Sequence, residues 1–84
     1  MAVVKFYSAF KEIFKNDVME LNDVENLNDL LSKLAELNPK FQHYLGRDDF
    51  VVLVNGASIP RKEFNNVKLR KDDVIELFPP VSGG

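Results

Sequence analysis

The stretch Val74-Ile75-Glu76-Leu77-Phe78-Pro79-Pro80-Val81-Ser82-Gly83-Gly84 decides how the rest of the chain is interpreted. Residues 74–78 are typical of a β-strand, because β-branched and aromatic residues are enriched in strands. Pro79 and Pro80 then fix φ and remove two N–H donors, so strand pairing ends and the chain leaves in an extended direction. Gly83 and Gly84 have no Cβ atoms, which makes the tip narrow. We therefore expect a globular unit over 1–78 and a C-terminal tail over 79–84.

The narrow tip suggests a chemical role for the Gly84 carboxylate. A carboxylate does not react with sulfur or amine nucleophiles until it is activated, for example as an acyl-adenylate. The chain offers no catalytic group near the tip, so activation must take place inside another enzyme, whose channel the tail enters while the globular part docks outside. A disordered tail without a function is the alternative. A Gly-Gly ending is a weak motif, and the residues alone leave both interpretations open.

Length and composition restrict the possible classes of protein. The 84 residues are enough for one domain, and they contain no cysteine, which excludes disulfides, zinc–thiolate sites and iron–sulfur clusters. With 45 % hydrophobic residues, among them seven Phe, an apolar core can supply the stability. The 11 basic and 13 acidic residues give a net charge of −2, whereas nucleic-acid-binding domains normally carry a basic excess. We therefore expect no nucleic-acid partner.

The start of the chain and its apolar runs bear on location. No charged-then-apolar leader opens the sequence, and no apolar run approaches the roughly 18 residues of a membrane span. The lack of cysteine is compatible with a reducing compartment. We expect a cytoplasmic protein with no membrane contact.

The order of predicted elements is strand, strand, helix, strand, strand, strand. An antiparallel hairpin is expected first, with a short helical segment at its tip that Ser8 can cap. Asn26 then caps the clearest helix, in which leucines recur at three- and four-residue steps. The predicted strands are 3–7, 18–21, 50–54, 57–59 and 74–78, and the leucines are Leu27, Leu30, Leu31, Leu34 and Leu37.

Several local features carry sharper expectations. Asn38-Pro39 starts a second helix, which Gly46 can end in a left-handed conformation. The run 50–54 is nearly all apolar, which predicts a central strand buried on both faces or nearly so. Asn55-Gly56 is a hairpin turn, and 61–66 is a polar loop.

Two groups of polar residues could suggest other chemistry. His43 is the only histidine, so we interpret it as a surface residue and expect no metal site. A solvated face is the favoured interpretation of the basic residues between 61 and 71, because acidic residues interleave with them. The alternatives are a docking surface for an acidic partner or a phosphate- or RNA-binding patch.

One helix across a mixed sheet of four or five strands, with a Gly-Gly tail leaving the last strand, resembles the β-grasp (ubiquitin-like) fold of the α+β class. More narrowly, the chain resembles the small subunit of molybdopterin synthase and related ubiquitin-like sulfur carriers. The resemblance covers essentially the whole chain. It rests on Phe6-Tyr7-Ser8-Ala9-Phe10-Lys11-Glu12, on Val54-Asn55-Gly56, and on Leu69 to Asp73 leading to the terminal heptapeptide Phe78 to Gly84.

This resemblance implies a mechanism and a set of partners. An adenylating enzyme of the ubiquitin-activating type would use ATP to adenylate Gly84, and a sulfur donor protein carrying a persulfide would then convert it to a thiocarboxylate. The large subunit of molybdopterin synthase would receive the loaded tail. No bound cofactor is implied. The residues that would enter or line the partner's channel are Pro79, Pro80, Val81, Ser82, Gly83 and Gly84.

Tyr7 and Phe78 would belong to an apolar docking surface near the exit of the tail, with core packing as an equal alternative. Two positions depart from the family pattern. Asp72 replaces a frequent glycine, and aspartate tolerates a left-handed conformation. Lys11 replaces a frequent arginine, and lysine keeps the charge but loses the bidentate fork.

The same activated tip also fits other functions. A protein modifier joined to target lysines, or a sulfur carrier for tRNA thiolation or thiamin synthesis, would use an adenylated glycine in the same way. A β-grasp interaction module with an inert tail is a further alternative. Intrinsic catalysis is not expected, because no nucleophile–base spacing is present.

Overall fold

The structure is a computed structural model, and it describes residues 1–47 and 49–80. Five strands form one mixed sheet in the order β2-β1-β5-β3-β4. β1 and β5 run parallel, whereas the other neighbouring pairs are antiparallel. The strands are β1 (Ala2–Phe6), β2 (Val18–Leu21), β3 (Val51–Val54), β4 (Ala57–Ser58) and β5 (Val74–Phe78).

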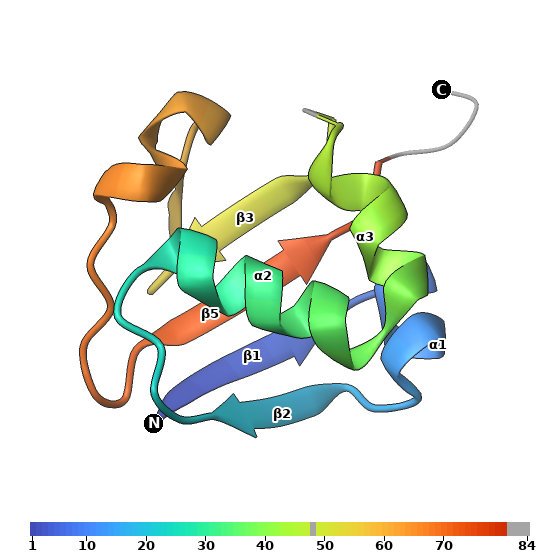
Figure 1. Cartoon of the computed structure of the whole chain (residues 1–84), viewed down its shortest axis with the longest axis horizontal. Coiled ribbons are helices and arrows are strands. Elements are labelled where there is room, and N and C mark those ends of the chain that lie inside the picture. The colour runs from blue at the N-terminus through green and yellow to red at the C-terminus, as the bar shows by residue number, and fades with distance from the viewer. Residues whose placement is uncertain (48, 81–84) are drawn as a thin grey trace.

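The helices lie on one face of this sheet, with α2 crossing in front of the strands (Figure 1). They are α1 (Ala9–Phe14), α2 (Leu27–Leu37), α3 (Pro39–Leu45) and the 3-10 helix η1 (Arg61–Asn66). The Asn26 side chain accepts the Asp29 N–H at 2.8 Å, and the Asn38 side chain accepts the Lys40 N–H at 3.0 Å. The N-caps predicted at Asn26 and Asn38 are therefore confirmed, and so is the hairpin of β1 and β2 with α1 at its tip.

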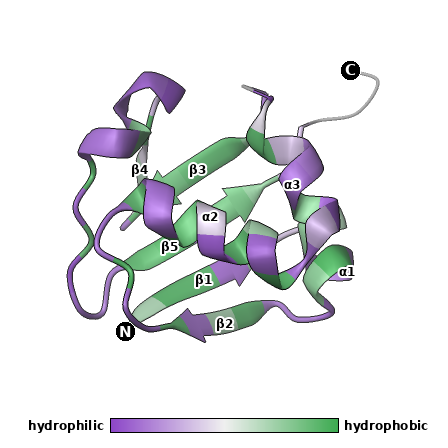
Figure 2. Ribbon diagram, viewed as in Figure 1, coloured by the Kyte–Doolittle hydropathy of each residue, from purple (hydrophilic) through white to green (hydrophobic). Residues whose placement is uncertain are grey.

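Apolar side chains from α2 and from the strands form the core between the two layers. Figure 2 shows hydrophobic residues along β1, β3 and β5 beneath the helices. The buried leucines of α2 are Leu27, Leu30, Leu31 and Leu34. Leu37, expected on the same stripe, is 56 % exposed, so that part of the prediction is wrong. Phe41 of α3 is fully buried and continues the core after α2 ends.

A group of aromatic rings fixes the shorter helices to the sheet. Phe10 of α1 meets Phe41 edge-on with 5.3 Å between ring centroids, and it meets Tyr44 at 4.9 Å. Phe50, just before β3, lies 6.1 Å from Phe64 of η1. Such ring pairs contribute stability beyond the burial of apolar area. Most of the seven Phe residues therefore serve to attach α1, α3 and η1 to the sheet.

Three local predictions were wrong. Ser8 precedes α1, but its backbone (φ 53, ψ −127) is not the extended form of a capping residue and its side chain makes no cap hydrogen bond. The reason is that the chain must reverse directly after β1. Gly46 is right-handed (φ −80, ψ −5), because the chain continues in a tight turn in which the Arg47 N–H donates to the Tyr44 carbonyl oxygen at 3.0 Å. Residues 61–66 form η1, which buries Phe64.

The strand β3 is also less buried than its apolar sequence predicts. Val52 faces the helices and is 1 % exposed, whereas Val51 is 44 % exposed on the opposite face. The helices cover only one side of the sheet, so a run of apolar residues here does not mean burial on both faces. The predicted Asn55-Gly56 turn is confirmed, with positive φ at both residues, and Asp72 (φ 74) adopts the left-handed conformation expected of it.

Candidate functional site

The sheet has an open face, by which we mean the strand side chains that point away from the helices. Alternation along each strand and the register between strands place Lys5, Glu76 and Leu53 in one row across it. Val51 and Phe78 form the next row toward the end of β5. The open face is thus largely apolar, with a cation and a carboxylate in its middle. It ends where the tail begins.

Tyr7 and Phe78 lie together at this end of the open face. Because β1 and β5 are parallel and Phe6 pairs with Leu77, the next residue of each strand emerges at the same edge. The two rings are stacked, with centroids 4.3 Å apart and planes 8° from parallel. Both side chains are half-buried, and neither belongs to the buried core. The core-packing alternative is therefore wrong for this pair, and their role in docking remains a prediction.

Glu76 joins this pair although the sequence did not identify it. The Tyr7 hydroxyl donates a hydrogen bond to Glu76 Oε2 at 2.6 Å. This bond raises the pKa of Tyr7 above its ordinary value, and partial burial and the nearby negative charge act in the same direction. The period of two along 74–78 places Glu76 on the same face as Phe78, so a prediction that β5 pairs in parallel with β1 would have found it.

The tail begins immediately beyond the stacked rings. Pro79 and Pro80 follow β5 and are half-buried. The remaining predicted site residues lie outside the described residues, so their roles stay predictions. These residues are Val81, Ser82, Gly83 and Gly84.

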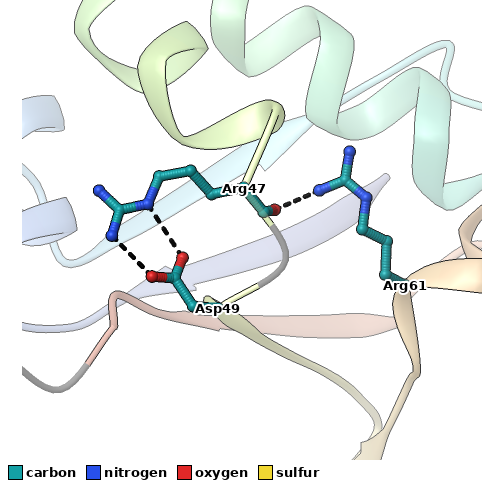
Figure 3. A network of polar contacts seen from close by, with 3 residues as sticks. All are labelled: Arg47, Asp49 and Arg61. Atoms are coloured by element: carbon teal, nitrogen blue, oxygen red, sulfur yellow. Dashed lines mark hydrogen bonds and ion pairs between the residues drawn. The ribbon is translucent and has the colours of Figure 1, made fainter.

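We call the point where the chain leaves β5, at Phe78, the exit. Across β5 from Tyr7, a polar network fixes the connection between α3 and β3 (Figure 3). Arg47 donates to both carboxylate oxygens of Asp49, from Nε at 3.0 Å and from Nη2 at 2.6 Å. This bidentate pair lowers the pKa of Asp49 and raises that of Arg47. Arg61 of η1 donates to the Arg47 carbonyl oxygen. Because Val51 pairs with Phe78, the network helps to place β3 against the last residue of β5.

The end of the sheet opposite the exit is held by Asp73. Its carboxylate accepts the Arg70 backbone N–H at 2.6 Å and the Asn55 side-chain amide at 2.9 Å. These bonds lower the pKa of Asp73, the one from Arg70 contributing most. Asn55 in turn accepts the Val74 N–H at 2.9 Å, so the β3–β4 turn is tied to the start of β5.

His43 and Lys11, two other polar residues singled out in the sequence, lie on the surface. Within residues 1–47 and 49–80, no three histidine or acidic side chains come together as a possible metal site. His43 is exposed, as expected. The Lys11 ammonium is 4.0 Å from the Asp17 carboxylate on the surface, a weak contact. In the same described part, no helix is long and apolar enough to cross a bilayer.

The open face thus ends at Phe78, directly before Pro79 and Pro80. The model of the ThiS family matches residues 4–84. The chain belongs to the ThiS family. The match extends through the tail, so the chain is a ubiquitin-like sulfur carrier or modifier of this family, in agreement with the resemblance noted from its sequence.

Solved structures with the same fold cover nearly the whole chain. A putative molybdopterin converting factor subunit 1 from Pyrococcus furiosus is 26 % identical over 95 % of this chain and 97 % of its own, with a TM-score of 0.72. A chain in a complex of subunits 1 and 2 of molybdopterin-converting factor from Helicobacter pylori is 25 % identical over 99 % of this chain and 97 % of its own, with a TM-score of 0.66.

A third similar structure is small archaeal modifier protein 1 from Methanosarcina acetivorans. It is 24 % identical over 99 % of this chain and 95 % of its own, with a TM-score of 0.79, and it supports the fold alone. No curated protein matches the chain. The β-grasp fold expected from the sequence is confirmed.

Proposed function

We propose that the chain carries sulfur as a thiocarboxylate on Gly84 and delivers it in molybdopterin biosynthesis. The observation that carries this proposal is the exit, where an apolar face ends at Phe78 and the chain passes directly into Pro79 and Pro80. A protein that hands over a group at the end of its chain needs a docking face beside a stiff stalk. Family membership through residue 84 supports the same proposal.

Each part of the chain has a role in the proposed cycle. An adenylating enzyme joins the Gly84 carboxylate to AMP from ATP, with release of pyrophosphate. The terminal sulfur of a persulfide on a donor protein attacks the acyl carbon and displaces AMP, and a thiol then reduces the resulting acyl disulfide to free the thiocarboxylate. The chain has no cysteine, so the sulfur atom that is transferred comes from its partners.

The open face and the tail divide the work of recognition. Tyr7 and Phe78 contribute apolar area that the partner covers. Pro79, Pro80, Val81 and Ser82 form the stalk, and restriction by the prolines lowers the entropy lost on insertion. Gly83 and Gly84 pass the narrowest part of the channel, where a Cβ atom would meet the wall. The cycle takes place in the cytoplasm, where ATP and reduced thiols are available.

Two observations support the molybdopterin pathway as the one proposed here. The Pro-Pro-Val-Ser sequence of residues 79–82 is more typical of carriers of the molybdopterin type than of other carriers. Two similar structures at 25 % identity or above are a putative molybdopterin converting factor subunit 1 and a complex of subunits 1 and 2 of that factor. A large subunit of molybdopterin synthase is accordingly the proposed recipient.

The first test is loading. Purified chain is incubated with an adenylating enzyme of the family, ATP and a persulfide donor, and intact-mass spectrometry is expected to show exchange of one oxygen for sulfur. Fragmentation should place the exchange on Gly84. A variant with one alanine appended after Gly84 is the control and should gain nothing. No exchange with any related adenylating enzyme would refute the proposal.

The second test separates sulfur delivery from protein modification. Loaded chain is mixed with a large synthase subunit and a pterin precursor, and consumption of the thiocarboxylate with sulfuration of the pterin is expected. In parallel, tagged chain is recovered from its own cells and digested with trypsin, and target lysines are searched for the remnant that cleavage after Lys71 would leave, residues 72–84 joined through Gly84. Abundant remnants without pterin sulfuration would favour a modifier, because an adenylated glycine also reacts with amines.

A further inference from the structure

The contact between Tyr7 and Glu76 links two strands at the point where the tail departs. The two residues are 69 positions apart in the chain, yet the hydroxyl-to-carboxylate distance is 2.6 Å. A hydrogen bond to an ionised acceptor is stronger than one between neutral groups. We infer that Glu76 is a positioning residue, which holds the Tyr7 ring against Phe78 and so sets the direction in which the tail leaves the sheet. This inference rests on the proposed function.

The geometry explains why the exit needs such a support. The β3–β5 pairing ends with Val51 and Phe78. Pro79 and Pro80 have no N–H groups, so they cannot extend the ladder. Because proline also fixes its own φ, the direction in which the stalk leaves the sheet depends chiefly on the backbone conformation of Phe78. The stacked Tyr7 ring limits the positions open to the Phe78 side chain, and through it to this backbone.

Glu76 supplies the second point of attachment for the Tyr7 ring. Stacking alone leaves one ring free to slide over the other, because offset arrangements differ little in energy. The hydroxyl at the far end of the Tyr7 ring is held by Glu76, which lies two residues before Phe78 on the same strand face. Ring and hydroxyl are thus both fixed to β5.

The expected effect falls on the step in which the tail is inserted. Tyr7→Phe keeps the ring and its apolar area but removes the hydroxyl, and this hydroxyl already has an internal partner. The affinity of the open face for the partner should therefore change little. A tail that can leave the sheet in more directions, however, loses more conformational entropy when it enters the channel. A lost hydrogen bond corresponds to roughly three- to tenfold in rate.

The test measures adenylation kinetics on the full chain. Its concentration is varied against the adenylating enzyme and ATP, and pyrophosphate release is recorded. Tyr7→Phe and Glu76→Ala should each lower kcat by roughly three- to tenfold, while KM stays within about twofold. The double variant should be no worse than either single one. Glu76→Gln keeps an acceptor oxygen and should restore most of the rate.

Glu36→Ala is the matched control, because it removes an exposed carboxylate from α2, in the layer of helices on the other side of the sheet from the open face. It should leave kcat and KM unchanged. Wild-type rates in Tyr7→Phe and Glu76→Ala would overturn the inference. So would a change in KM alone, or a Glu76→Gln variant as poor as Glu76→Ala, because either result would assign Glu76 to contact with the partner.

A second measurement on the free chain does not depend on the proposed function. NMR should show close contacts between the rings of Tyr7 and Phe78 and a ring-current shift on the Pro79 δ protons. Both should weaken in Glu76→Ala and persist in Glu36→Ala. Unchanged spectra would overturn the inference even if the wild-type chain is never adenylated, whereas weakened contacts with an inactive wild-type chain would leave only the proposed function refuted.

Discussion

The two faces of the sheet are held in different ways. On the covered face, apolar side chains from α2, α3 and the strands pack together, and the described residues include no buried polar or charged side chain. On the open face, apolar residues remain partly exposed and polar contacts fix particular groups, as Glu76 does for Tyr7. Neighbouring residues of one strand can therefore differ completely in what they contribute.

Under the proposed function, this difference separates stability from recognition. Apolar burial is nondirectional and contributes most of the free energy of folding, so the covered face keeps the domain folded. Hydrogen bonds at half-exposed positions contribute less but specify orientation. A surface that must dock to a partner gains from leaving its apolar area unburied and its geometry defined. Substitutions on the two faces should reveal this division of roles.

The largest effect is expected from Phe10→Ala on the covered side. Phe10 is fully buried and contacts Phe41, Tyr44 and Phe50. The loss of the ring should lower the free energy of unfolding by about 3–5 kcal/mol. Urea unfolding followed by circular dichroism measures this change. A loss below about 1 kcal/mol, the size of a surface effect, would contradict the role of this cluster in attaching α1 and α3.

A smaller effect is expected from the adjacent pair Val52→Ala and Val51→Ala. Val52 is 1 % exposed on the covered face, and its truncation should cost roughly 2 kcal/mol of unfolding free energy. Val51 is 44 % exposed on the open face, and its truncation should cost less than about 0.5 kcal/mol. Val51→Ala should instead raise KM for the adenylating enzyme. Equal destabilisation by the two variants would show that the open face is not open in solution.

Most of the fold followed from patterns that act locally. The leucine spacing after Asn26, the Asn38-Pro39 start and the Asn55-Gly56 turn each specify one backbone geometry, and the structure has all three. The errors arose where long-range packing decides. The apolar run 50–54 does not reveal that helices cover one face only, and the 61–66 segment forms a helix because Phe64 reaches the core.

Local patterns have the same limit at the candidate site. The tail was identified from Pro79, Pro80 and the terminal glycines, because their constraints are properties of single residues. The resemblance supplied Tyr7 and Phe78. Glu76 was missed because its role depends on the parallel pairing of β1 and β5, which joins segments about seventy positions apart. No local sequence pattern predicts a pairing between such distant segments.

Polar contacts also hold the end of the sheet opposite the tail, where the Asp73 carboxylate accepts hydrogen bonds from the Arg70 N–H and the Asn55 side-chain amide. Its pKa lies below the ordinary value of 3.8, so the ionised form is favoured in the folded state. The stabilisation is present above the unfolded pKa and is lost as pH falls through the lower folded pKa. Solvent screening keeps it below about 1 kcal/mol.

Unfolding experiments at decreasing pH test this contribution. The difference in stability between the wild-type chain and Asp73→Ala should be constant near neutral pH and should narrow as pH falls below about 4. Other carboxylates titrate in the same range, but they are common to both proteins and cancel in the difference. A gap that stays constant throughout the acid range would mean that the Asp73 charge contributes nothing.

The smallest effect concerns the Tyr7 hydroxyl, and spectrophotometric titration of a Tyr44→Phe variant isolates it, because the chain has two tyrosines. The hydrogen bond to Glu76 holds the pKa of Tyr7 above 10.0, so its absorbance midpoint should lie above that value. The bond stabilises the neutral form, and its contribution is therefore present below the unfolded pKa and is lost as pH rises through the raised folded pKa. Adding Glu76→Ala should return the midpoint toward 10.0, since it removes both the acceptor and the nearby negative charge. A midpoint that is the same with and without Glu76 would mean that the hydroxyl is not held in solution, and that the open face is fixed by ring stacking alone.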